Sequence, residues 1–140
     1  MGWRSDWLYQ LVFVEVERVW HRAQRDGQSK FGPAPDALLI SEKAEADWSR
    51  VLCRGPVGRR WAYRGGLPEL LIADPTGGSP GERRGMFYEQ GLVEFCVAAD
   101  RQRVLVTYTI GPRYGRGTAF VVVGQGARGR LVQDGEFWVS

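Results

Sequence analysis

Three glycines near the end of the sequence have the spacing of a phosphate-binding loop. Gly124, Gly126 and Gly129 form a GxGxxG pattern directly after the predicted strand Thr118 to Val123. In a dinucleotide site such glycines open a helix whose N-terminal NH groups bind the pyrophosphate, and a second parallel strand follows. The residues after Gly129 instead contain the turn dipeptide Asp134-Gly135. We therefore expect that NAD and FAD do not bind, and the sequence predicts no other cofactor.

The overlapping octamer Arg116 to Val123 resembles the RNP1 segment of RNA-recognition domains, Arg-Gly-aromatic-Ala-Phe-Val-x-aromatic. Five of its seven specified positions agree. Thr118 and Val123 replace the other two aromatics, so Phe120 is the single side chain left to stack on a base. The RNP2-like run Val12 to Val14 lies much farther upstream than in that family. We interpret the octamer as a buried strand bounded by glycine turns.

Residues suited to catalysis or metal binding are few. Glu17 and His21 stand four positions apart, a spacing more typical of a contact on a solvated helix face than of a base with its orienting carboxylate. Glu94 alternates with apolar neighbours, as a general acid in a sheet-lined pocket or an exposed strand residue would. Cys53 and Cys96 are far apart and the chain has one histidine, so we expect reduced, buried thiols and no metal site. No catalytic residue is assigned.

Arginines alternate with aromatic residues in three segments of the chain. Such clusters bind phosphates and stack bases, anchor protein interfaces, or form solvated strand edges. The candidate partner-binding residues are Arg59, Arg60, Trp61, Arg83, Arg84, Arg113, Tyr114 and Arg116.

The composition predicts a folded protein. The chain has 140 residues, of which 44% are hydrophobic and 25% charged, and its net charge is +3. No apolar run approaches the ~18 residues that a membrane span needs. The first residues, MGWRSDW, do not have the pattern of a signal peptide, so we expect a cytoplasmic protein without membrane contact.

Two helices are predicted before the period of the apolar residues changes. Asp6 to Arg25 has the helical i, i+3, i+4 spacing of apolar residues, with Ser5 or Asp6 as N-cap. The alternation of apolar residues in Leu11 to Glu17 keeps a strand as the alternative prediction for that segment. Asp36 to Arg54 indicates a second helix that Gly55 ends.

After Gly55, short apolar runs alternate with turn residues and predict strands that pair as hairpins. Asp134-Gly135 predicts a type I′ turn, and Gly111 to Gly117 a hairpin loop. Ala119 to Val123 is apolar throughout, as in a central strand covered on both sides. In the preceding strand we expect Val104, Val106, Tyr108 and Ile110 to face the helix, and Leu105, Thr107 and Thr109 to face outward.

The predicted fold is α+β, with one or two N-terminal helices packed on a mostly antiparallel meander sheet in a single domain, residues 1–140. This order, ending in Asp134-Gly135-Glu136-Phe137-Trp138, resembles the NTF2-like superfamily, whose last strand often carries a DG-x-W pattern. The resemblance implies a curved sheet, in a family that includes pocket enzymes, ligand binders and immunity proteins.

The number of aromatic residues suggests a function in binding. Six Trp, five Tyr and six Phe are more than one small core readily hides. We expect a small non-enzymatic protein that binds a protein partner, such as an inhibitor, immunity or accessory protein. The alternative is a nucleic-acid-binding module that uses the arginine-aromatic loops, followed by an NTF2-like small-molecule pocket protein.

Overall fold

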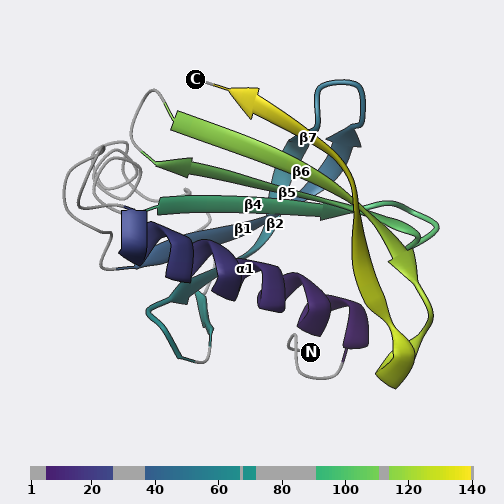
Figure 1. Cartoon of the computed structure of the whole chain (residues 1–140), viewed down its shortest axis with the longest axis horizontal. Helices are drawn as coiled ribbons and strands as arrows, with labels where there is room; N and C mark the ends of the chain where they lie inside the picture. The colour runs from purple at the N-terminus through teal and green to yellow at the C-terminus, as the bar shows by residue number, and fades with distance from the viewer. Residues whose placement is uncertain (1–5, 27–36, 67, 72–90, 111–113, 140) are drawn as a thin grey trace.

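The computed structural model describes residues 6–26, 37–66, 68–71, 91–110 and 114–139, which form one long helix and seven strands (Figure 1). In chain order the elements are α1 (Trp7–Asp26), β1 (Leu38–Asp47), β2 (Leu52–Tyr63), β3 (Glu69–Leu71), β4 (Gly91–Val97), β5 (Arg103–Ile110), β6 (Tyr114–Val123), the 3-10 turn η2 (Gly126–Arg128) and β7 (Arg130–Val139).

Helix α1 settles the ambiguity of the segment Leu11 to Glu17 in favour of a helix. Its first turn is capped by Asp6, whose Oδ1 accepts a hydrogen bond of 3.0 Å from the backbone NH of Leu8. Val12 and Val16 are fully buried, whereas Val14 between them is 47% exposed. Burial therefore follows the helical period, because packing of one helix face outweighs the strand propensity of valine.

The strands form one sheet in the order β3-β2-β1-β4-β5-β6-β7. Every neighbouring pair is antiparallel except β1 and β4, which run parallel and join two antiparallel meanders. Helix α1 lies across one face of this sheet (Figure 1). The predicted α+β class with a mostly antiparallel sheet is thereby confirmed.

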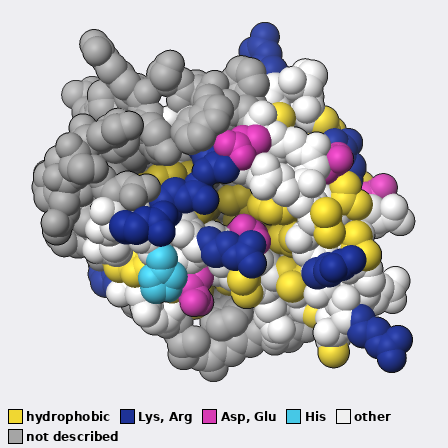
Figure 2. Space-filling view, in the orientation of Figure 1, with side chains coloured by type: hydrophobic (Ala, Val, Ile, Leu, Met, Phe, Trp, Pro, Cys, Tyr) yellow, Lys and Arg dark blue, Asp and Glu magenta, His cyan; other side chains and the backbone are white. Residues whose placement is uncertain are grey.

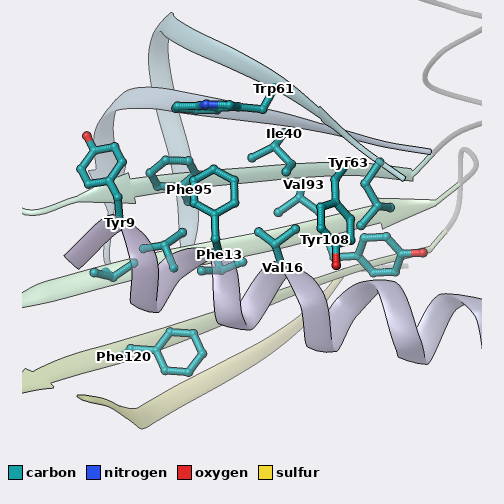
Figure 3. Close-up of a cluster of buried hydrophobic side chains, with 14 of the residues drawn as sticks. Tyr9, Phe13, Val16, Ile40, Trp61, Tyr63, Val93, Phe95, Tyr108 and Phe120 are labelled. Carbon is teal, nitrogen blue, oxygen red and sulfur yellow. The ribbon is translucent and has the colours of Figure 1, made fainter. Parts of the chain in front are cut away.

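Aromatic side chains fill the core between α1 and the sheet (Figure 3). The Phe13 ring meets the Trp61 ring edge to face, with centroids 5.3 Å apart. Val104, Val106 and Tyr108 belong to this core, so their predicted orientation toward the helix is confirmed.

The opposite face of β5 is also buried, contrary to the prediction that it faces outward. Leu105 is 0% and Thr107 is 7% exposed. The hairpin of β1 and β2 packs Trp48, Val51 and Cys53 into the cluster that holds Leu105. A period-two pattern shows which residues share a face, but only the bend of a distant hairpin decides what covers that face.

The predicted second helix, Asp36 to Arg54, is wrong: this segment forms β1 and the start of β2. Leu38, Leu39 and Ile40 are all buried and pair with β2 on one side and with β4 on the other. Because those partners come later in the chain, the local helical spacing could not reveal them, and tertiary pairing outweighed it.

The C-terminal strands correct three further predictions. Asp134-Gly135 is not a hairpin turn: Ala119 pairs with Gly135 and Phe120 with Gln133, so Asp134 is the extra residue of a β-bulge within β7.

β6 already begins at Tyr114, so Gly115 to Gly117 belong to a strand, while residues 111–113 of the predicted loop lie outside the described residues. Val123 is 39% exposed, so Ala119 to Val123 is not covered on both sides along its whole length.

A candidate binding groove between the helix and strands β5 to β7

Two of the three candidates on β2, Arg59 and Trp61, are engaged within the protein. The Nε atom of Arg59 lies 2.9 Å from Glu42 Oε1, and its guanidinium carbon lies 4.8 Å from the centroid of the Tyr9 ring. Trp61 is fully buried, so its side chain exposes no surface in this conformation. Arg60 is half-buried and pairs across the strands with Ser41 and Leu71.

The remaining candidates divide between β6 and regions that are not described. Arg83, Arg84 and Arg113 lie outside the described residues, and Tyr114 marks the start of β6. Arg116 is half-buried on β6, and its Nη2 atom lies 2.5 Å from Glu136 Oε2. Strands β1, β4 and β5 separate β2 from β6 in the sheet, so the described candidates do not form a single cluster.

Arg116 lines a groove of about 200 Å³ between α1 and the second meander. The residues around this groove, called the arginine groove below, are Glu15, Arg18, Val19, Arg22, Val106, Tyr108, Arg116, Thr118, Phe120, Leu131 and Gln133. Figure 2 shows the face that carries α1, where Lys and Arg side chains (dark blue) gather next to exposed hydrophobic side chains (yellow).

Two local periods bring these residues together. Glu15, Arg18, Val19 and Arg22 follow the i, i+3, i+4, i+7 spacing and therefore share one side of α1. The strand residues alternate along each strand on the face toward α1, and the register joins Phe120 to Gln133 across β6 and β7.

The arginine groove carries a net positive charge over an apolar floor, although Glu15 pairs with Arg18 and Glu136 at the rim pairs with Arg116. Its lining holds three arginines and one carboxylate, Glu15. Arg18 Nη1 lies 2.6 Å from Glu15 Oε1, while the side chain of Arg18 is 69% exposed. Burial raises the pKa of the Glu15 carboxyl above its ordinary value, and the Arg18 charge offsets this only in part. Such a groove suits an anionic group carried on an apolar body.

The network around Arg116 extends to strand β7. Gln133 Nε2 donates a hydrogen bond of 3.0 Å to the same Glu136 oxygen that Arg116 contacts. Thr118 and Glu136 face each other across β6 and β7, so this network connects the two strands at the rim of the groove. Charge-assisted bonds of this kind fix the Arg116 side chain in one orientation.

The remaining residues that were considered for catalysis or metal binding make structural contacts. His21 and Glu17 are both exposed, with 3.8 Å between Nε2 and Oε1, as a solvated helix contact predicts. Glu94 is half-buried and lies 3.1 Å from Lys43 Nζ. Cys53 and Cys96 are free and buried, which confirms their predicted burial. Within the described residues, no group of three or more His, Cys, Asp or Glu could hold a metal ion.

The glycine motif forms a tight connection between antiparallel strands. Gly124 has a φ of +77°, and a Cβ there would lie 2.4 Å from the carbonyl oxygen of Arg128. β7 follows and pairs antiparallel with β6, which is not the strand-helix-strand geometry of a pyrophosphate loop. Phe120, the RNP1-like aromatic, is only 6% exposed and belongs to the core.

Sequence reasoning missed most of the arginine groove. Arg18, Arg22 and Gln133 were not among the candidates, although Trp20 stands between the two arginines in the sequence. The helical spacing of residues 15, 18, 19 and 22 was a usable signal, since it places two arginines next to an apolar position on one side of α1.

Comparison with known proteins gives no match: no family model fits the chain, and neither a curated protein nor a solved structure is detectably similar to it. The resemblance to the NTF2-like superfamily is therefore not shown. No helix among the described residues is long and apolar enough to cross a membrane.

Proposed function

We propose that this protein is a small non-enzymatic protein that binds a protein partner through the arginine groove. The observation that carries the proposal is the combination of Arg18, Arg22 and Arg116 around an apolar floor on one open face. Arginine next to aromatic and aliphatic surface is the composition found at the energetic centres of protein interfaces.

The size of the groove favours a protein partner over a free small molecule. Its volume is about 200 Å³. Pockets for drug-sized ligands and cofactors usually measure about 300–1,000 Å³ and enclose most of the ligand. A groove below that range accommodates one or two side chains, as an anchor pocket in an interface does.

The described aromatic residues support a nucleic-acid role less well. Trp61 and Phe120 are buried at 0% and 6% exposure, so neither offers a free face to a base. Arg59 covers the Tyr9 ring and pairs with Glu42, which leaves less of its charge for a phosphate. Arg18 and Arg116 of the groove also pair with carboxylates, but they lie over an apolar floor, which suits a protein side chain.

Affinity purification from the native host tests the proposal. Tagged wild-type protein and an Arg18→Gln, Arg22→Gln variant are compared, each with and without nuclease. The matched control, Arg50→Gln with Arg54→Gln, removes the same charge from exposed residues of the β1–β2 hairpin, outside the groove.

We expect a protein partner that survives nuclease treatment, binds the control variant, and is reduced by about tenfold or more in the groove variant, because an interface arginine can contribute about 2 kcal/mol. Equal capture by the groove variant and the control contradicts the proposal. Capture that disappears with nuclease supports the nucleic-acid alternative instead.

A further inference from the structure

The edge of the sheet next to the arginine groove is open in the described structure. β7 is the last strand in the sheet order and pairs on one side with β6, and no described strand pairs with its other side. Figure 1 shows β7 (yellow) as the last strand of the sheet, with its beginning next to the N-terminal end of α1, where Gly129 lies against the Trp7 ring. The bulge at Asp134 divides the strand into two regular parts, Arg130 to Gln133 beside the arginine groove and Gly135 to Val139 beyond the bulge. An unpaired edge of this kind offers backbone donors and acceptors to another strand.

The two faces of this edge differ in chemistry. On the face toward α1, Leu131 and Gln133 line the arginine groove with Arg18 and Arg22. On the other face, Val132 pairs across with Val121, and Val132 is 41% exposed.

That second face continues along β6 as an apolar strip. Val123, two residues beyond Val121, is 39% exposed and pairs with Arg130. Val123 and Val132 are two of the three large hydrophobic residues that are exposed in the described part of the chain. One margin of the sheet thus carries arginines toward α1, and on its reverse exposes Val123 and Val132 beside Arg130.

We propose that the partner adds a short extended segment to the edge of β7 at Arg130–Gln133, and that this segment alternates acidic and apolar residues. Its acidic side chains face Arg18 and Arg22, and its apolar side chains pack on Val132. The charge of the groove selects the acidic face, and the period of two places the apolar residues on the other face. This inference rests on the proposed function, since it specifies the partner of the same groove.

A second copy of this chain is a poorer occupant of the edge. Two copies that join antiparallel at β7 around a two-fold axis perpendicular to the sheet bring their α1 faces to the same side. The cationic grooves of the two copies would then lie next to each other, and like charges at an interface are unfavourable. An acidic segment has the opposite effect, because it neutralises Arg18 and Arg22.

The test uses a fluorescent peptide of repeating Glu-Val as the probe for the full-length protein. The control peptides are a repeating Lys-Val peptide and a Glu-Val peptide whose amide nitrogens are methylated, which removes its backbone donors. Fluorescence anisotropy measures affinity for the wild type, for Arg18→Gln with Arg22→Gln, and for the matched Arg50→Gln, Arg54→Gln control. Hydrogen exchange followed by NMR compares the free and the peptide-bound protein.

We expect the Glu-Val peptide to bind about tenfold or more tightly than either control peptide, and to lose about tenfold in affinity in the groove variant alone. On binding, alternate amides within Arg130–Gln133 should gain protection. The strand addition is overturned if the Glu-Val peptide does not bind, or if it binds without this protection. It is also overturned if light scattering shows a wild-type dimer and hydrogen exchange shows that the amides of Arg130–Gln133 are already protected in it. Any of these results leaves the proposed function standing if affinity purification still shows partner capture that depends on the groove.

Discussion

Gly117 on β6 lies directly against the backbone of Val51, the residue that precedes β2 in the β1–β2 hairpin. A Cβ at position 117 would lie 2.5 Å from the carbonyl oxygen of Val51. Val51 itself has a φ of 52°, which is a strained conformation for a β-branched residue. The close approach of these two residues holds the hairpin against the rear of the sheet, over the cluster of Cys53, Cys96 and Leu105.

Gly117→Ala should therefore destabilise the protein by about 1–3 kcal/mol, because the methyl group overpacks a contact with rigid backbone. Urea denaturation followed by tryptophan fluorescence measures the change. Gly66→Ala is the matched control, since a Cβ at that exposed position meets nothing within 4 Å. Equal stability of the two variants would show that the hairpin does not pack against β6 in solution.

The buried thiols should react only when the protein unfolds. Cys53 Sγ lies 2.6 Å from Cys96 Sγ, and this hydrogen bond, together with burial, raises the pKa of the Cys53 thiol far above its ordinary value. Little thiolate is then present in the native protein at neutral pH. Mass spectrometry should find no alkylation of the native protein and two labels after unfolding without reductant. Absence of both labels after unfolding would indicate a disulfide.

Replacing Glu15 should change the pH dependence of stability. Because burial raises the pKa of Glu15 in the folded state, its ionisation lowers the free energy of unfolding as the pH rises through that pKa. Below the ordinary pKa the group is protonated in both states and this loss is absent. Glu15→Gln should therefore gain stability relative to the wild type between about pH 4 and about pH 7.

Parallel urea titrations at the two pH values measure the difference. The lost ion pair with Arg18 is a small opposing effect, because the Arg18 side chain is 69% exposed. A variant that loses stability relative to the wild type as the pH rises would mean that the ion pair outweighs burial.

Trp61→Ala should cost about 3–5 kcal/mol of stability, the usual loss for removing a buried aromatic side chain. The Trp61 ring packs on Phe13 and lies at the centre of the core. Trp61→Phe should cost less, because Trp61 Nε1 has no hydrogen-bond partner among the described residues and no bond is lost. If Trp61→Ala abolishes partner binding in a protein that is still fully folded, Trp61 contacts the partner after all.

Binding of single-stranded RNA or DNA should be weak at about 150 mM salt and unaffected by Arg113→Ala with Arg116→Ala. If these arginines bound phosphates, affinity would fall by about 0.7 log units per tenfold rise in salt for each contact, and the double substitution would flatten that slope. Fluorescence titrations with a short oligonucleotide at two salt concentrations measure both quantities. Submicromolar affinity at about 150 mM salt that the substitutions abolish would support the nucleic-acid alternative.

Local patterns predicted the elements whose partners lie close in sequence. The helical spacing of Leu8, Val12 and Val16 indicated α1, and the alternation of Val104, Val106 and Tyr108 indicated the face of β5 that packs on it. The α+β class followed from these two periods. Both periods depend only on the positions of the apolar residues, which can be read directly from the sequence.

Only the tertiary structure decided which strands pair and which residues form the groove. Leu38 to Ile40 became a central strand because β2 and β4 supply its backbone partners, and Asp134 became a bulge because β6 continues past it. Arg18 and Arg116 are almost a hundred positions apart in the chain, yet packing of α1 on the second meander places both in one groove. Such contacts depend on chain closure over long separations, which no local spacing encodes.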